Sequence, residues 1–471
     1  MKKLKYITSL IIGAATLFSC DLMDSIDNIQ PEYQLEEGNY ITTPKSAEQA
    51  LNGIYQGWRA WGISPFRAHI SVLSGSLNAG QGISGIEGFA TNEVETDNIA
   101  IRDFYTANYS IINSANYLIE ALGAGKAVGI DSVRNVEIIG ECKFHRALAH
   151  FMLLRQFGQF YDESSPYGIV LRQEPYRPDS PITARDNVVD SYSSILQDLT
   201  DASSTAPEFV YMHDRISRLT AKALKAKVLL YKKDYPEAAA LAQEVLNEAA
   251  NYGYSLELGD WSQLFSQHYL HPETLFAPYT SGTTESCSIS IDRTIVGSYT
   301  TSLATQWAAK AGIGADLRYT TTFQSTTSLS GNGKYPYATS YPSGSGNGYI
   351  FMRLTEVYLI HAEAEARQGA NHYAAARASL KVITDRAGYP AELVDQIGDE
   401  ELLEAIRQHK WIELAAETGE EWFDLVRYTA NGDLAFETIK STLTQAWQFI
   451  LPIPQKALSG NKLLKQNPEY E

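Results

Sequence analysis

The side chains that could perform catalysis or hold a metal ion do not converge in this sequence. Cys142 and His145 are three residues apart on a predicted helix, but a metal site needs three or four converging ligands. His150 lies roughly a quarter-turn away around that helix. Glu363 and Glu365 point about 160° apart on another predicted helix, so they cannot share one glycosidase site. With no HExxH, G-x-S-x-G or P-loop motif, the sequence predicts a non-enzyme without metal or cofactor.

Several acidic residues toward the C-terminus are interpreted as structural. Glu420 and Glu421 stand beside a predicted helix end, where pairing with basic side chains explains them better than catalysis does. Glu413, Asp424 and Arg427 receive the same interpretation. The alternative to a binding protein is a surface enzyme, which would convert its ligand into product.

Cys20 is the cysteine with a predicted chemical role, because of what precedes it. Three lysines begin the chain, residues 7–17 are apolar apart from small or hydroxyl side chains, and Ser19 stands just before Cys20. This pattern is typical of a secretory signal (residues 1–19) ending in a bacterial lipobox, where lipids are attached to the cysteine. The run is too short to span a membrane, for which about 20 residues are needed. An ordinary signal with an incidental cysteine is the alternative.

Charge and cysteine content exclude other classes of protein. The net charge is −17, and loss of residues 1–19 removes three lysines and no acids, which gives −20. Such a body is a poor partner for nucleic acid or an anionic membrane, because both require a clustered positive field. Beyond Cys20 only Cys142 and Cys287 remain, so there is no disulfide framework, and Cys142 is predicted to be a small buried hydrophobe.

Aromatic side chains in two loop-like stretches are the candidates for ligand binding. Sugar rings stack their C–H faces on Trp and Tyr, while their hydroxyls bind amides, carboxylates and guanidinium groups. Residues 319–349 and the loop 59–105 combine these groups with glycine and serine. The predicted ligand-binding residues are Trp61, Arg67, Trp307, Tyr335, Tyr337 and Tyr341. For each aromatic, packing in the core or docking on a partner protein is the alternative. Tyr55 and Trp58 are assigned to the core instead, because they continue an apolar helical stripe.

These loops must be positioned by helices, which hydrophobic periodicity predicts in seven blocks. Ser46 is predicted to cap the first helix, with Gln49 as its capping-box partner. Residues 71–100 are predicted to be loop. Further helical blocks are expected at 103–122, 135–157, 187–201, 216–250 (a pair joined by 232–236), 350–386 and 399–427.

The spacing of small and aromatic residues in two blocks suggests degenerate tetratricopeptide units. In 216–250 the pattern includes Ala226, Tyr235, Ala238 and Ala242, and 350–386 is similar. A plain helical bundle is the alternative. The resulting division is a signal peptide (1–19), a lipidated tether and lead-in segment (20–45), an N-terminal helical part (46–250), a loop-rich insertion (251–349), and a C-terminal helical part with an irregular tail (350–471).

Six stretches, in order along almost the whole chain, resemble the SusD/RagB family of outer-membrane lipoproteins. They are the lipobox with the acidic residues after it, 137–160 (EIIGECKFHRALAHFMLLRQFGQF), 215–227 (RISRLTAKALKAK), 353–364 (RLTEVYLIHAEA), 412–417 (IELAAE) with 422–427 (WFDLVR), and 452–454 (PIP) with Asn461 and 466–470 (QNPEY). The chain departs from the family pattern near His409-Lys410, at Glu421 and at Glu469, which affects local ion pairs rather than the fold.

This resemblance implies a fold and a function. The fold is mainly α, a degenerate tetratricopeptide-type scaffold with a large loop-rich insertion. The implied protein is lipid-anchored at the outer membrane, faces the cell surface, and passes a captured nutrient to a SusC-type TonB-dependent transporter. An oligosaccharide is the expected ligand, and a peptide, as in the RagB branch, is the alternative.

Overall fold

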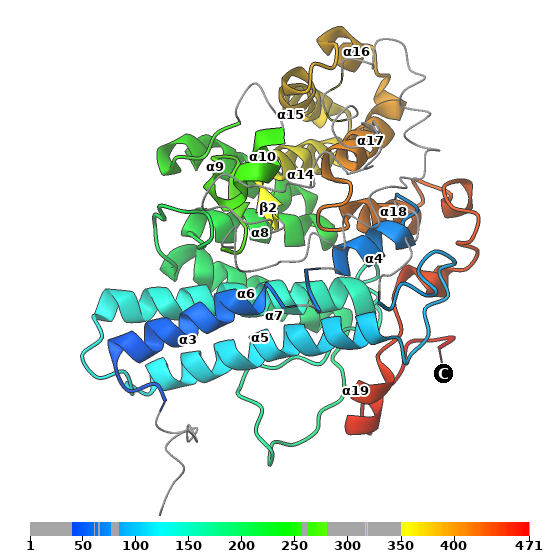
Figure 1. The fold of residues 1–471 in the computed structure, drawn as a ribbon. Coiled ribbons are helices and arrows are strands. Elements are labelled where there is room, and N and C mark those ends of the chain that lie inside the picture. The colour runs from blue at the N-terminus through cyan, green and yellow to red at the C-terminus, as the bar shows by residue number, and fades with distance from the viewer. Residues whose placement is uncertain are drawn as a thin grey trace, which may run out of the picture.

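The computed structural model describes residues 40–60, 62–64, 66–76, 84–256, 262–279, 316, 318 and 350–470. These residues are mainly helical (Figure 1). The α-helices are α3 (Pro44–Gly57), α4 (Phe66–Leu73), α5 (Ile99–Gly123), α6 (Ser132–Phe157), α7 (Val188–Thr205), α8 (Arg218–Tyr231), α9 (Tyr235–Glu248), α10 (Ser262–Gln267), α14 (Leu354–Ala366), α15 (Tyr373–Arg386), α16 (Ala391–Asp395), α17 (Leu402–Leu414), α18 (Glu420–Ala430) and α19 (Gln455–Gly460). The short 3₁₀ helices are η1 (Ala249–Tyr252), η2 (His268–Leu270), η5 (Ala370–His372), η6 (Asp399–Glu401), η7 (Phe436–Thr438) and η8 (Ala446–Phe449). Strands β1 (Thr274–Phe276) and β2 (Met352–Arg353) pair antiparallel.

The helices form an array in which each packs on the next along the chain. Helix α5 packs on α6, α6 on α7, α7 on α8, and α8 on α9. Helix α9 then packs on α14, which packs on α15 and α17, although more than a hundred residues separate α9 from α14 in sequence. Figure 1 shows α5, α6 and α7 as a long layer below α8, α9 and α14. Nearest-neighbour packing of this kind is typical of helical repeats and agrees with the predicted tetratricopeptide-type scaffold.

Small residues allow these helices to approach each other closely, as the repeat pattern predicted. Ala226, Ala238 and Ala242, where α8 and α9 pack, have no exposed surface. Helix α6 and the end of α7 also approach each other closely, at Gly140. A Cβ atom on Gly140 would lie 2.6 Å from the backbone nitrogen of Ala206, so only glycine fits there.

The helical blocks predicted from sequence all occur, with boundaries that differ from the predicted ones by up to four residues. The N-cap of the first helix is Thr43, whose hydroxyl accepts a hydrogen bond from the Ser46 backbone, so the prediction of Ser46 as the cap was wrong. Ser46 instead occupies the third helical position and closes the capping box, and Pro44 fits at the helix start because its missing N–H is not needed there. Helix α5 begins at Ile99, capped by Asn98, four residues before the predicted start.

The stretch predicted to be loop at 71–100 is partly helical. Helix α4 extends to Leu73, and its eight residues are all buried. Periodicity did not reveal α4, because its eight residues are fewer than the roughly 11 to 18 over which a helical period can be recognised. Between α4 and α5 the described residues 84–98 form turns, as predicted.

Two aromatic residues assigned to the core are confirmed there. Tyr55 is 5% exposed and Trp58 is fully buried. The Trp58 indole donates a hydrogen bond of 3.0 Å to Nδ1 of His145, and the Tyr55 and His145 rings meet edge-on with centroids 4.2 Å apart. Cys142 is also fully buried, as predicted. Within the residues described, no group of three His, Cys, Asp or Glu side chains is arranged to hold a metal ion.

Buried ion pairs join the helices of the C-terminal half. Both oxygens of Glu363 on α14 bind Arg427 on α18, at 2.8 and 2.9 Å, and Lys410 on α17 lies between Glu363 and Asp424. Glu420 on α18 binds Arg155 of α6 at 2.6 Å and Lys227 of α8 at 2.7 Å. These contacts confirm that Glu420 and Asp424 pair with basic side chains, and Glu421 accepts hydrogen bonds from the Ser71 hydroxyl and the Ala416 backbone.

A further buried cluster, here called the root clamp, holds the two strands. It consists of Glu273, Arg353, Arg386, Glu413 and Glu417. Arg353 at the end of β2 binds Glu273 beside β1 at 2.7 Å, Glu413 of α17 at 2.8 Å and Glu417 at 2.9 Å. Arg386 of α15 contacts both Glu273 and Glu413. Burial alone would raise the pKa of Glu413, but the guanidinium groups of Arg386, Arg353 and Arg318 outweigh it and hold that pKa well below its usual range.

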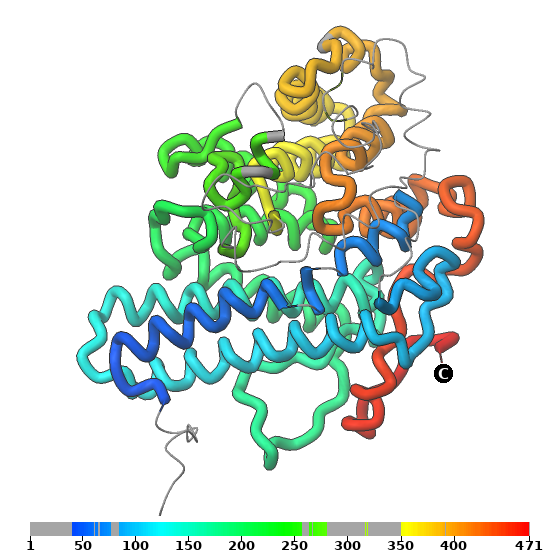
Figure 2. Tube along the Cα trace, in the orientation of Figure 1, coloured from blue at the N-terminus to red at the C-terminus, as the bar shows by residue number. Residues whose placement is uncertain are grey.

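The C-terminal segment returns to the N-terminal part of the array. The Leu451 N–H donates to the Gln156 carbonyl at the end of α6, and the Gln455 N–H donates to the Thr96 carbonyl before α5. Figure 2 shows this segment, in red, beside the start of α5. Over the described ranges, no helix combines the length and apolarity required to cross a bilayer.

Removal of one carboxylate from the root clamp should destabilise the fold strongly. In the Glu413→Gln variant, Arg353 and Arg386 lose the charge they share, and we expect a loss of about 3–5 kcal/mol in unfolding free energy, as for other broken buried pairs. Urea unfolding followed by circular dichroism measures it. In the control Lys381→Gln, which breaks an exposed pair with Asp395, the expected loss is below about 1 kcal/mol. Equal losses in both variants would contradict a special role for the clamp.

Two buried histidines should make the fold sensitive to acid. Burial, with a smaller effect from Arg215, lowers the pKa of His145 to about 3, and burial with Arg146 lowers that of His150 to about 3. Both rings use an unprotonated nitrogen as acceptor, His145 from Trp58 and His150 from the Arg172 backbone.

Below pH 6.5 the unfolded chain takes up protons that the folded protein does not. Stability should therefore be complete above about pH 6.5 and fall toward pH 3, by about 1.4 kcal/mol per pH unit for each histidine. The His145→Gln variant keeps an acceptor but does not titrate, so its stability should fall less steeply between pH 6 and 4. Chemical denaturation across that range measures the slope, and an unchanged slope would refute the assignment.

Candidate ligand-binding site

Most of the residues predicted to bind ligand lie outside the described part of the chain. Trp61, Trp307, Tyr335, Tyr337 and Tyr341 are among these, and so is the predicted lipid anchor, Cys20. Their roles stay predictions. Arg67 is the predicted site residue that the structure describes.

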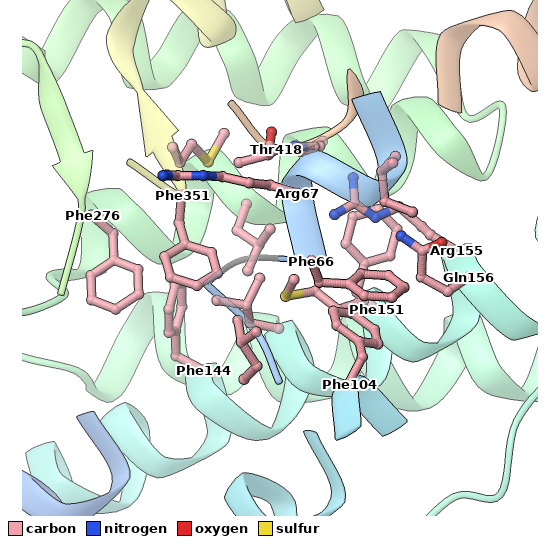
Figure 3. Close-up of a pocket in the computed structure, with 17 residues that line it drawn as sticks. Phe66, Arg67, Phe104, Phe144, Phe151, Arg155, Gln156, Phe276, Phe351 and Thr418 are labelled. Carbon is pink, nitrogen blue, oxygen red and sulfur yellow. The ribbon is translucent and has the colours of Figure 1, made fainter. Parts of the chain in front are cut away.

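Arg67 does not lie on an exposed loop, as its sequence context suggested. It belongs to helix α4, is 6% exposed, and lines a cavity between α4, α6 and the two strands. Figure 3 shows its side chain along one edge of this cavity, across from phenylalanine rings that include Phe66, Phe144 and Phe351. The cavity measures ≈ 30 Å³, which is room for about two water molecules and not for a sugar ring.

A larger, open pocket lies where α3 ends, and it is the candidate site. Its volume is ≈ 360 Å³, within the range of small-molecule sites. The residues around it come from the end of α3, from the loop before α8, and from the segment after β1. They are Asn52, Tyr55, Gln56, Arg59, Met212, Asp214, Arg215 and Tyr279.

Helix α3 supplies one wall of the pocket through its polar face. Asn52 and Gln56 are four residues apart and lie on one face of the helix, Arg59 follows in the turn just after it, and Leu51 and Ile54 face the core. Asn52 and Gln56 are exposed, and the Arg59 guanidinium donates a hydrogen bond to the Gln56 side chain. This wall therefore presents amide and guanidinium groups held by a rigid helix.

The loop before α8 supplies the charged part of the pocket. The Arg215 guanidinium lies 4.2 Å from the centre of the Tyr55 ring and donates to the Asn52 side chain. Tyr55 in turn donates to Glu141 at 2.5 Å and accepts from the Ile216 backbone at 3.2 Å, which fixes the ring beneath Arg215.

Asp214 lies beside Arg215 and carries an acceptor atom that no described residue uses. Its Oδ1 atom is buried and has no hydrogen-bond partner in the part of the chain that the structure describes. Burial raises the pKa of Asp214, and Arg215 partly opposes the change. An unsatisfied buried oxygen costs free energy, so a ligand hydroxyl that donates to it would be favoured.

Aromatic and thioether groups complete the pocket at its open side. Tyr279 is 40% exposed, with its ring centre 5.3 Å from that of Tyr269, and Met212 is 44% exposed. Tyr279 lies three residues after the end of β1, and the root clamp holds the chain at Glu273, just before that strand. Arg59 begins the predicted binding loop 59–105, so this loop starts at the pocket.

These groups suit binding rather than catalysis. Amides, guanidinium groups and a free carboxylate oxygen can bind sugar hydroxyls, while an exposed tyrosine ring can stack on a sugar face. Asp214 is the one carboxylate among the described residues around the pocket. Glycoside hydrolysis uses two carboxylates on either side of the bond, and this lining supplies one.

Sequence reasoning missed the pocket residues, although part of the signal was present. The polar spacing of Asn52, Gln56 and Arg59 could have been read as an exposed face opposite the predicted core stripe. The pairing of this face with Asp214 and Tyr279 could not, because 155 or more residues separate them from Arg59 and only the folded array brings them together.

Comparison with known proteins shows which proteins the chain is similar to. A family model described as the SusD family matches residues 296–470, and one described as starch-binding associating with outer membrane matches residues 41–230. SusD-like protein P2 of Formosa agariphila is 24% identical to this chain over an alignment of 523 positions. The alignment covers 99% of this chain and 100% of the relative.

Solved structures show the same fold. A SusD superfamily protein from Bacteroides vulgatus has a TM-score of 0.76 at 20% identity, over 91% of this chain and 99% of that one. A laminarin-binding SusD-like protein has a TM-score of 0.70 at 24% identity, over 91% of this chain and all of that one. Because the two family models match both halves of the chain and the relatives match nearly its whole length, the chain belongs to the SusD/RagB family.

Proposed function

We propose that the protein is a surface lipoprotein that binds a nutrient oligosaccharide and delivers it to a SusC-type TonB-dependent transporter. The observation that carries this proposal is the open pocket at the end of α3, where hydroxyl-binding groups surround an exposed tyrosine. The family description, starch-binding associating with outer membrane, and the laminarin-binding relative support a glycan ligand at the outer membrane.

The predicted aromatic residues belong to the same proposal. Trp61 follows Arg59 by two residues, and Trp307, Tyr335, Tyr337 and Tyr341 follow Tyr279 in the chain. We propose that they extend the pocket into a longer platform for several sugar rings. Prolines beside Tyr335, Tyr337 and Tyr341 restrict the backbone, which reduces the entropy lost when a ligand binds.

A peptide ligand is the second candidate, because Asp214, Arg59 and Arg215 could also bind the charged ends and amides of a peptide. Isothermal titration of the full-length protein against panels of neutral oligosaccharides and of short peptides separates the two. Binding of peptides alone would assign the protein to RagB-like capture. Incubation of the same mixtures, analysed for new reducing ends or free amines, tests for turnover, and we expect none.

Removal of the exposed groups of the pocket should weaken oligosaccharide binding without loss of stability. In the Asn52→Ala/Gln56→Ala/Tyr279→Ala variant, hydroxyl contacts and a stacking face are lost from exposed positions. We expect the affinity for the best oligosaccharide to fall by about 1–3 kcal/mol, as for contacts at the centre of a binding site. Titration measures the affinity, and thermal unfolding should give a Tm within about 2 °C of the wild type.

The matched control is Tyr40→Ala, since Tyr40 is also 40% exposed and lies outside the pocket. It should bind as the wild type does. An unchanged affinity in the well-folded triple variant would move the ligand site away from the end of α3.

Anchoring is tested by the Cys20→Ala variant. If lipids on Cys20 hold the protein at the membrane, the variant should leave the membrane fraction and remain folded, because several acyl chains are needed for durable anchoring. Fractionation with immunoblotting measures this. Protease treatment of intact cells should cut the wild-type protein, and resistance of the lipidated protein would place it on the periplasmic side and refute surface capture.

A further inference from the structure

A second open groove lies on a different face of the array, and neither the family comparison nor the proposed function accounts for it. It measures ≈ 400 Å³ and runs between the first half of α5, the segment 170–176 and the C-terminal segment around α19. These elements lie together at the lower side of Figure 1. The groove shares no residue with the pocket at the end of α3.

The charged side chains that line this groove are basic. Arg102, Arg172 and Lys456 line it, and none of the described residues in its lining is acidic, although the chain carries a net charge of −17. Arg102 is neutralised by Asp103 at 2.8 Å. Arg172 and Lys456 form no ion pair with any described residue, so two positive charges remain for a ligand. Positive charges gathered in a concave site favour an anionic partner.

Tyrosine rings form the walls between these charges. The Tyr105 and Tyr109 ring centres lie 4.7 Å apart, and the Tyr109 hydroxyl donates to the Val170 carbonyl at 2.9 Å. Across the groove Tyr176 is 44% exposed, and the Arg172 guanidinium lies 4.9 Å from the centre of its ring. A sugar ring could therefore stack on tyrosine while its acidic group meets Arg172.

Hydrogen bonds hold the groove in shape before a ligand arrives. The Asn113 side chain on α5 accepts from the Tyr176 backbone at 2.6 Å. Asn116, one turn further along, donates to the Arg172 and Glu174 carbonyls at 3.1 and 2.9 Å. On the other side the Asn461 side chain donates to the Thr183 carbonyl at 2.7 Å. A wall fixed in this way loses little conformational entropy on binding.

We propose that this groove is a second binding site, and that its ligand is an acidic oligosaccharide bearing uronate or sulfate groups. Arg172 and Lys456 bind the acidic groups, and Tyr105, Tyr109 and Tyr176 contact the rings. The site is independent of the pocket at the end of α3, so the protein can hold an acidic chain at one face while a neutral segment occupies the other.

Titration with trigalacturonate and with its fully methyl-esterified form tests the proposal, since the two differ in charge and little in size. The full-length protein should bind the acid at least tenfold more tightly, and added NaCl should reduce the difference. Neocarratetraose sulfate in a parallel titration shows whether a sulfate ester serves in place of the carboxylate. Equal binding of the acid and the ester, with no binding of the sulfated sugar, would overturn the proposal.

Variants locate the binding. Arg172→Gln/Lys456→Gln should abolish the preference for the acid, whereas Lys45→Gln, which removes an exposed and unpaired lysine elsewhere, should retain it. Tyr176→Ala should weaken binding of the acid and of its ester. The Asn52→Ala/Gln56→Ala/Tyr279→Ala variant should keep the preference, so this result is independent of the proposed function. Loss of the preference in that variant, or tighter binding of triglutamate than of trigalacturonate, would overturn the groove as an acidic-sugar site.

Discussion

Buried charge at the root clamp is the interaction on which the arrangement of this protein depends. Arg353 and Arg386 meet Glu273, Glu413 and Glu417 in a region with almost no exposed surface. Each charge would be costly to bury alone, so the cluster is stable only when all its elements are in place. It therefore fixes β1, β2, α15 and α17 relative to one another. Hydrophobic packing aligns the helices, but it is less specific about their register than a set of directional ion pairs.

The helical array and the root clamp stabilise different parts of the structure. Close packing through alanines and Gly140 makes a rigid body from helices that contact mainly their neighbours. The clamp then joins Glu273, within the long connection between α9 and α14, to Arg353 at the end of that connection. The pocket at the end of α3 lies beside one of these fixed points, because Tyr279 follows β1 by three residues. Loops carry binding groups best when their ends are held rigidly, and this arrangement supplies that support.

The sequence predicted the long helices well, and it did not predict the pocket at the end of α3, for a physical reason. Helices such as α5 and α7 bury one face against neighbours, so their periodicity is visible in the residues themselves. Helix α4 makes only about two turns, too few for a helical period to be recognised, and Arg67 was consequently placed on a loop. Sites depend on residues distant in the chain, such as Gln56 and Asp214, and local spacing does not specify which of them meet.

The direct packing of α9 on α14 has a consequence for how proteins of this architecture diversify. Two helices adjacent in space are separated by more than a hundred residues of sequence, so the helical array continues across this connection without a break. A change in the length of the connection costs little free energy, because the entropy of closing a longer loop grows only slowly with its length. The connection can therefore change in sequence and length while the packing of α9 on α14 is kept.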